Sequence, residues 1–126
     1  MNKNQEERVR IHKKFNGHCS YCGRVITMKE MQVDHQFPKA QLKYFCKKID
    51  NVFVYPDLDC FDNLFPSCRR CNHYKRDYTL EQFRNLMQTL HTRIGQDYIN
   101  KVAMDFGIIQ ITPFSGRFYF EQFNNR

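Results

Sequence analysis

Cys19-Ser20-Tyr21-Cys22-Gly23, together with Cys68-Arg69-Arg70-Cys71, decides the fold of this chain. Each stretch separates two thiols by two residues, which is the spacing of a metal knuckle, and Gly23 suits the left-handed turn that follows a knuckle. Four thiolates form a tetrahedral sulfur set that favours structural Zn2+ and leaves no position open for catalysis. The alternative, unrelated buried thiols or a redox pair, fits two such pairs in one short chain less well. We therefore predict one zinc site with the ligands Cys19, Cys22, Cys68 and Cys71.

The remaining cysteines, Cys46 and Cys60, stand outside any pair at ligand spacing. We interpret them as small buried hydrophobic residues or spare thiols. Residues 1–14 lack the apolar segment of a secretory signal, and no apolar run of the chain is long enough to cross a membrane. We expect a cytoplasmic protein without a membrane partner, in which the thiols stay reduced and bind metal rather than form disulfides.

Length and charge set broad limits on the function. The 126 residues suit one compact domain. Lys and Arg number 20 against 13 Asp and Glu, which gives a formal net charge of +7. This balance favours a polyanionic partner through phosphate contacts, although solubility alone would also account for it. The charge supports a nucleic-acid motif but cannot replace one.

Hydrophobic periodicity and helix-ending residues predict an α+β chain. A strand or hairpin should deliver Asp34-His35, and it must end or bulge there if both side chains are to serve one site. Thr79, with Gln82 three residues on, marks the start of the most regular helix. The other expected elements are a helix over 5–16, β segments at 25–28 and 31–33, a short helix near 41–47 within an irregular insert at 39–60, a helix that starts around the second cysteine pair, a packing helix over 95–106, and a C-terminal hairpin of 108–112 with 117–123.

Polar residues stand in a fixed order around the cysteine pairs: Val33-Asp34-His35, then Asn63-Leu64, then Asn72-x2-Lys75. This order resembles the HNH endonuclease family, in which a ββα-metal (His-Me finger) unit is built between two cysteine pairs. The resemblance covers residues 15–76, about half of the chain. It implies a metal-dependent nuclease that hydrolyses phosphodiester bonds of DNA, with double-stranded DNA as the first choice, and leaves 5′-phosphate and 3′-hydroxyl ends.

Elementary chemistry gives these residues the same roles. Hydrolysis of a phosphodiester needs a base for water and a cation for the developing negative charge. An imidazole, whose ordinary pKa is about 6.5, can accept a proton from water at neutral pH, and the resemblance makes His35 the general base. The hard oxygens of Asp34 and Asn72 suit Mg2+ or Mn2+, and the resemblance makes these residues the ligands of the catalytic ion. It also gives Asn63 the role of holding the loop that carries the base, where a simple cap is the alternative.

The chain departs from the family pattern at Asn72, where a literal match would have histidine. His73 follows at once and would face elsewhere on a helix, so it ranks second as a ligand. An imidazole ligand would favour Zn2+ or Ni2+ over Mg2+ or Mn2+, so the choice of catalytic metal depends on this position. Four basic residues nearby are candidates for phosphate contacts, or else plain solvated charges: Arg69, Arg70, Lys75 and Arg76.

Together these observations predict a small α+β single domain over 1–126, with a ββα-metal and zinc core at 15–76 and a helical and hairpin extension at 77–126. The cofactors would be structural Zn2+ and catalytic Mg2+ or Mn2+, and a homodimer would explain double-strand cleavage simply. The competing function is a non-catalytic, zinc-stabilised nucleic-acid-binding module. Such a module would need the basic residues, but not Asp34, His35 and Asn72 together.

Overall fold

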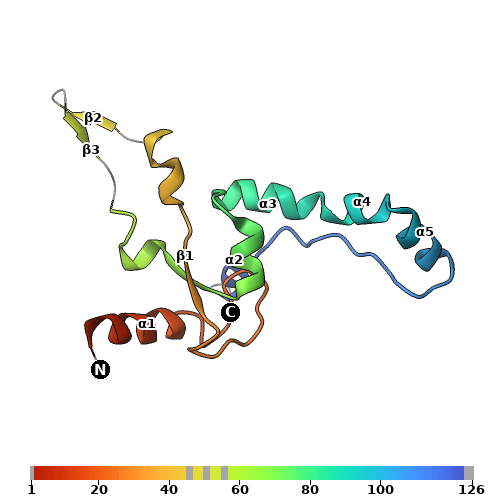
Figure 1. The fold of residues 1–126 in the computed structure, drawn as a ribbon, viewed down its shortest axis with the longest axis horizontal. Coiled ribbons are helices and arrows are strands. Elements are labelled where there is room, and N and C mark those ends of the chain that lie inside the picture. Colours follow the sequence, from red (N-terminus) through yellow and green to blue (C-terminus); the bar gives the residue numbers. More distant parts are fainter. Residues whose placement is uncertain (1, 45–46, 50–51, 55–56, 124–126) are drawn as a thin grey trace. The chain divides into compact units, whose positions relative to one another are not determined.

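The computed structural model describes the backbone of residues 2–44, 47–49, 52–54 and 57–123, and the side chains of 2–41 and 57–123. The chain divides into two compact units, a first unit of residues 1–80 with 118–126 and a second unit of residues 81–117. Figure 1 shows their helices and strands. The extension predicted for 77–126 is therefore shared between the two units, because its last segment belongs to the first.

Helices and short strands along the described chain give the small α+β architecture that the sequence predicts. The helices are α1 (Lys3–Lys13), α2 (Arg69–Lys75), α3 (Leu80–Gln88), α4 (Leu90–Gly95), α5 (Tyr98–Asp105) and α6 (Tyr119–Phe123), with the 3-10 helices η1 (Lys39–Tyr44) and η2 (Phe61–Asn63). The strands are β1 (Gln32–His35), β2 (Lys47–Ile49), β3 (Val52–Val54) and β4 (Leu64–Ser67). Among the described residues, no helix is long and apolar enough to span a membrane.

Helix α1 begins with a capping box, a pattern that the sequence analysis overlooked. The Asn2 side chain accepts from the backbone N of Gln5 at 2.8 Å, and the Gln5 side chain accepts from the backbone N of Asn2 at 3.0 Å. The helix predicted over 5–16 is confirmed as an element, but it begins at Lys3 and ends at Lys13. The chain then turns through Asn16 and Gly17, whose φ angles of 54° and 79° are incompatible with a helix.

Strand β1 pairs with β4 in an antiparallel two-stranded sheet, and α2 follows β4 directly (Figure 1). The pairing sets Asp34 opposite Phe65 and His35 opposite Leu64 in a register without a bulge. The strand predicted to deliver Asp34-His35 is confirmed, and it ends at His35. Helix α2, predicted around the second cysteine pair, packs against β1. This sheet and helix position the candidate site.

The β segment predicted at 25–28 is wrong, and so is a hairpin between it and 31–33. Val25 makes only an isolated bridge with His18, since the turn of the first cysteine pair uses the neighbouring backbone groups. In that turn the backbone N of Cys19 donates to the carbonyl of Arg24 at 2.8 Å. The chain closes a metal knuckle here instead of extending a strand.

Aromatic rings fill the core of the first unit. The ring of Phe65 in β4 lies 5.8 Å from that of Phe15 and 4.9 Å from that of Phe120, between centroids, and both pairs meet edge to face. Phe118 is 2% exposed and meets Tyr21 edge to face at 5.4 Å. Such pairs each contribute about 0.5–1.5 kcal/mol beyond their buried area. The first cysteine pair, β4 and the C-terminal segment therefore share one core.

The predicted C-terminal hairpin is wrong. Residues 108–112 form no strand, and 117–123 contain helix α6. The Glu121 side chain accepts from the backbone N of Phe118 at 2.9 Å, a reciprocal cap that favours a helical turn over an extended strand. Aromatic β propensity in this segment yields to that cap and to the burial of Phe118.

The insert predicted at 39–60 is more regular than expected. Helix η1 begins at Lys39, close to the short helix expected near 41–47. Strands β2 and β3 pair antiparallel, an element that the sequence analysis did not predict. Cys46 lies outside the described residues, whereas Cys60 is exposed and not the small buried residue that was one of its two interpretations.

The second unit consists of helices and an extended segment. Helix α3 begins directly after Thr79, as predicted, and α5 confirms most of the helix expected over 95–106. Gly107 ends it with a φ of 71°, also as predicted. The expected packing of α5 is wrong, however, because Tyr98 and Ile99 are 80% and 70% exposed.

Candidate zinc centre and active site

The four predicted zinc ligands lie together between the turn after α1 and the start of α2. Cys68 is the N-cap of α2, and its Sγ accepts from the backbone N of Cys71 at 3.4 Å. All four sulfur atoms lie within 4.8 Å of one another, and those of Cys22 and Cys68 are 3.9 Å apart. Sulfur atoms at about 2.3 Å from a tetrahedral zinc ion would be about 3.8 Å apart. The cluster of Cys19, Cys22, Cys68 and Cys71 could therefore hold a structural Zn2+.

Because these thiols are crowded together, their pKa values differ from one another. Hydrogen bonds from Cys22 and Cys71 hold the pKa of Cys19 far below the ordinary thiol value. The hydrogen bond with Cys19 in turn raises the pKa of Cys22 to about 11, and Cys19 also raises the pKa of Cys71. Thiols this close cannot all ionise unless a cation offsets their charge, which is what a zinc ion does.

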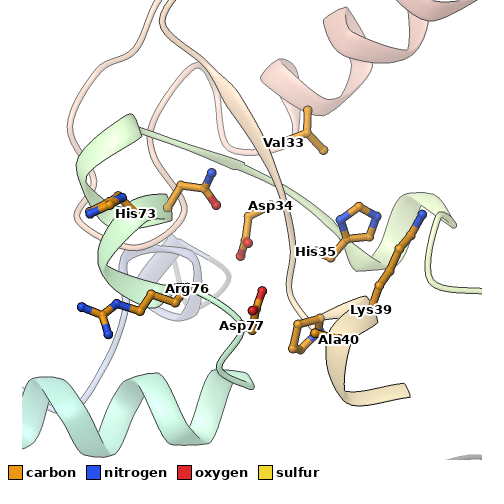
Figure 2. A pocket seen from close by; sticks show the side chains of 10 residues that line it. Val33, Asp34, His35, Lys39, Ala40, His73, Arg76 and Asp77 are labelled. Atoms are coloured by element: carbon orange, nitrogen blue, oxygen red, sulfur yellow. The ribbon is translucent and has the colours of Figure 1, made fainter. Parts of the chain in front are cut away.

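A hollow of about 750 Å3 opens beside β1 and α2, and we call it the β1–α2 hollow. Predicted residues from both elements line it, which brings together positions 34, 35, 72 and 76. Figure 2 shows the side chains of Asp34 and His35 leaving β1 on opposite sides, as alternation along a strand requires. Its lining residues are Val33, Asp34, His35, Pro38, Lys39, Ala40, Asn72, His73, Arg76 and Asp77.

Two buried side chains contact the carboxylate of Asp34. The Tyr21 hydroxyl donates to its Oδ2 at 2.5 Å, and the Lys75 ammonium lies 3.0 Å from the same oxygen. Burial raises the pKa of Asp34 above its usual value, although the charge of Lys75 and the Tyr21 hydrogen bond act in the opposite direction. Burial and the neighbouring Asp34 also raise the pKa of Tyr21. The other oxygen, Oδ1, has no hydrogen bond among the described residues.

Lys75 is a correction to the sequence analysis, which made it a candidate for phosphate contacts. The side chain is fully buried, and its ammonium also donates to the backbone carbonyl of His35 at 3.1 Å. The spacing from Asn72 correctly places both residues on the face of α2 toward β1. That face is interior at Lys75, so its charge serves Asp34 and not a phosphate.

His35 has a carboxylate partner that the sequence analysis missed. Its Nε2 lies 2.8 Å from Oδ1 of Asp59, and the Lys39 ammonium lies 3.0 Å from the same carboxylate. The hydrogen bond with His35 and then that with Lys39 lower the pKa of Asp59. Within the described chain, Nδ1 of His35 has no hydrogen-bond partner. Nothing in the sequence pairs positions 35 and 59, which are brought together only by the insert between them.

Asn63 ties together the two segments that carry His35 and Asp59. Its Oδ1 accepts from the backbone N of Phe37 at 2.8 Å, and its Nδ2 donates to the carbonyls of Phe37 and Leu58 at 3.1 and 2.9 Å. The side-chain amide thus uses both of its ends on backbone groups. This arrangement fits the loop-holding role that the resemblance implies, and it is more extensive than a simple cap.

Asn72 is oriented by a residue from the start of β1. Its Nδ2 donates to the Gln32 side-chain oxygen at 2.6 Å, and within the described chain the amide Oδ1 has no hydrogen-bond partner. His73, the second candidate, is exposed, and its ring points away from Asp34 in Figure 2. Of the two candidate ligands, Asn72 is therefore the one held toward β1, whereas the His73 ring faces away from Asp34.

The predicted arginines are exposed around the site. Arg76 lines the β1–α2 hollow, while Arg69 and Arg70 line a second, neighbouring hollow together with Arg24 and Lys29. Arg76 adopts a φ of 54° and a ψ of −136°, a conformation that side chains other than glycine rarely take. Strain of this kind is often found at functional sites. These five positive side chains could contact a polyanion.

Comparison of the chain with protein-family models, with curated proteins and with solved structures finds no match.

Proposed function

We propose that the chain is a metal-dependent endonuclease of the HNH type that hydrolyses DNA phosphodiester bonds. The observation that carries this proposal is that Asp34, His35 and Asn72 all line the β1–α2 hollow, with Asn72 following directly after Cys71 of the four-cysteine cluster. The order of the Asp34-His35, Asn63 and Asn72 motifs in the sequence is independent support for it. A sheet of two antiparallel strands followed by a helix also matches the element order that the resemblance implies.

In this proposal His35 is the general base. Its Nε2 is engaged by Asp59, so Nδ1 remains to accept the proton of a water molecule. That water attacks phosphorus in line as its proton passes to His35, the bond to the leaving 3′-oxygen breaks, and this oxygen takes up a proton from solvent water. Asp59 and Asn63 hold the imidazole and its loop and touch no reacting atom. Products with 5′-phosphate and 3′-hydroxyl ends follow from this direction of attack.

The donor set suits a hard divalent cation. Oδ1 of Asp34 and Oδ1 of Asn72 are the two acceptors that other described side chains leave unused. Carboxylate and amide oxygens are ligands of Mg2+ and Mn2+, which keep several positions for water and phosphate oxygens. A bound cation would stabilise the negative charge that develops on the phosphate. Because Lys75 already offsets the charge of Asp34, we expect weaker cation binding than at an unpaired carboxylate.

Double-stranded DNA is the proposed substrate. Arg76 lies in the hollow and could approach the phosphate that is cleaved, while Arg69 and Arg70, in the neighbouring hollow, could contact further phosphates of the backbone. Contacts of this kind position the backbone and read no bases directly. Any sequence preference must therefore come from elsewhere in the chain.

The test is cleavage of supercoiled plasmid in Mg2+, Mn2+ or EDTA, with Asn72→Ala compared against His73→Ala. We expect metal-dependent nicking or linearisation by the wild type and by His73→Ala, and little cleavage by Asn72→Ala. Zinc content, measured for all three proteins, should be the same. The reverse order of the two variants would assign the ligand to His73, and plasmid binding without cleavage in every metal would favour the non-catalytic binding module.

A further inference from the structure

We propose that Tyr21 and Lys75 are positioning residues that connect the zinc knuckle to the metal-binding carboxylate of Asp34. This inference rests on the proposed function, because it concerns the same divalent cation. Tyr21 stands between Cys19 and Cys22, so its backbone belongs to the zinc knuckle itself. Its hydroxyl reaches across the core to Asp34 Oδ2 at 2.5 Å.

Tyr21 and Lys75 both contact the same carboxylate oxygen of Asp34. The Tyr21 hydroxyl and the Lys75 ammonium, at 2.5 and 3.0 Å, each meet Oδ2 and leave Oδ1 toward the β1–α2 hollow without a described partner. Two donors on one oxygen fix the rotation of the carboxyl group about its bond to the chain. The free oxygen is thereby presented in one orientation, which is what a cation site needs from its supporting residues.

Tyr21 can act as a rigid support because its backbone is fixed on two sides. The preceding Ser20 donates to the carbonyl of Pro66 through both its backbone N, at 2.9 Å, and its hydroxyl, at 2.7 Å. The carbonyl of Tyr21 accepts from the backbone N of Tyr119 at 3.1 Å, and its ring packs edge to face on Phe118. β4 and the C-terminal segment therefore clamp the knuckle.

Lys75 also holds the backbone of His35, the proposed general base. Its ammonium bridges Asp34 Oδ2 and the backbone carbonyl of His35, so one buried charge contacts both adjacent residues at the end of β1. Lys75 also lies four residues after Cys71 on α2, so both halves of the zinc site reach Asp34, one through Tyr21 and the other through this helix. The structural ion and the catalytic carboxylate are thus parts of one connected network.

The test is the Mn2+ affinity of Tyr21→Phe, which removes one hydroxyl and keeps the ring. Loss of a supporting hydrogen bond of this kind weakens metal binding about 10-fold or more. We expect that rise in the Mn2+ dissociation constant, read from the electron paramagnetic resonance of free Mn2+. We also expect the same rise in the Mn2+ concentration for half-maximal plasmid cleavage, with the rate at saturating Mn2+ close to that of the wild type.

The matched control is Tyr119→Phe, whose ring is stacked on His18, the residue before Cys19. It should bind Mn2+ and zinc like the wild type. Zinc content and thermal unfolding are measured for each protein; in Tyr21→Phe the zinc content should be unchanged, and the melting temperature should fall only modestly because one buried hydrogen bond is lost. Loss of zinc from Tyr21→Phe would show that the hydroxyl supports the fold and not the second ion, which would overturn the inference.

The remaining outcomes separate the inference from the proposed function. Equal Mn2+ affinity in Tyr21→Phe and wild type, with plasmid cleaved by both, would contradict the inference and leave the nuclease intact. Weakened Mn2+ binding in Tyr21→Phe, with no cleavage by the wild type, would support the network and contradict the nuclease. A wild type that binds no Mn2+ would contradict both.

Discussion

At the scale of single residues, the pairing of His35 with Asp59 is the feature that most affects the proposed chemistry. Asp59 is held in turn, because its backbone N donates to the Asp57 side chain at 3.0 Å and its carboxylate meets Lys39. An imidazole whose Nε2 faces a carboxylate has one tautomer favoured and its ring orientation fixed. The carboxylate also stabilises the imidazolium that forms when the base accepts a proton.

We predict that Asp59→Asn lowers the maximal cleavage rate about 10-fold or more while leaving the Michaelis constant for DNA unchanged, because the base loses its support and the phosphate contacts remain. Steady-state cleavage of a short duplex measures both quantities. Asp62→Asn is the matched control, since Asp62 is also exposed, whereas the carboxylate that meets His35 is that of Asp59. An Asp59→Asn protein with wild-type rates would remove Asp59 from the account.

Arg76 carries a second prediction at this scale, because its backbone conformation and its side chain can be changed separately. Arg76→Gly and Arg76→Ala both remove the guanidinium, but only glycine accepts a φ of 54° with a ψ of −136° without strain. We expect both variants to bind DNA less tightly, and the glycine variant to be more stable than the alanine variant by about 1 kcal/mol. Urea unfolding checks the stability, and equal stabilities would refute the strain.

Some residues of the candidate site could be predicted from the sequence, and others could not. The ligand and base positions follow from local spacing, so Asp34, His35 and Asn72 could be named in advance. Burial is set by the whole core, so the spacing that placed Lys75 beside Asn72 could not reveal that its ammonium faces inward. Asp59 could not be named at all, because its contact with His35 depends on the path of the insert.

At the scale of elements, the four-cysteine cluster joins the turn after α1 to the start of α2. We predict that Cys71→Ser loses zinc and lowers the melting temperature by about 10 °C or more, because the two segments lose their common ligand set. Cys60→Ser, which changes an exposed thiol outside the cluster, should keep both the metal and the melting temperature. Colorimetric zinc release and circular dichroism measure the two effects. Equal behaviour of the two variants would contradict a structural zinc site.

Lys14 joins the segment after α1 to η2 and β4, and this contact predicts a dependence of stability on pH. Its ammonium donates to the carbonyls of Phe61 and Leu64 at 2.6 and 3.0 Å. Burial lowers the pKa of Lys14 from its ordinary 10.5, against the opposing charge of Asp62. As the pH rises, Lys14 therefore loses its proton at a lower pH in the folded state than in the unfolded state. Stability gained from Lys14 is complete above pH 10.5 and is lost as the pH falls through the lowered pKa.

We therefore expect the free energy of unfolding of the wild type to rise relative to Lys14→Met as the pH increases toward 10.5. Urea unfolding of both proteins at several alkaline pH values, in the presence of zinc, measures the difference. The exposed neighbour supplies the control, since Lys13→Met should follow the wild type. A constant difference between wild type and Lys14→Met would contradict the burial of this ammonium.

The elements themselves were predicted where local patterns decide them, and missed where distant contacts do. α3 could be placed from its capping residue and its apolar repeat. The C-terminal segment reads as strand from its aromatic residues, yet the backbone N–H groups of Tyr119 and Phe120 donate to the knuckle carbonyls of Tyr21 and Ser20. No pattern in residues 117–123 alone announces that partner.

At the scale of the whole molecule, all residues of the candidate active site belong to the first unit. That unit contains the four-cysteine cluster, the β1–α2 hollow and the candidate phosphate contacts. The second unit exposes large apolar residues on α5 and after it, Phe106 and Ile108 at 76% each among them. The sequence predicted the α+β architecture and the clustering of the four cysteines of the first unit well, because ligand spacing is local. The division of the chain into two units could not be predicted, since it depends on where the last aromatic residues pack.

The central claim is that His35 activates water for metal-dependent cleavage of DNA, and the most direct measurement is plasmid cleavage by His35→Ala beside the wild type and His73→Ala. All three proteins are first shown to contain the same amount of zinc and to unfold at the same temperature. We expect wild type and His73→Ala to nick the plasmid in Mg2+ or Mn2+ but not in EDTA, and His35→Ala to bind it and leave it intact. Cleavage by His35→Ala at the wild-type rate would contradict the claim.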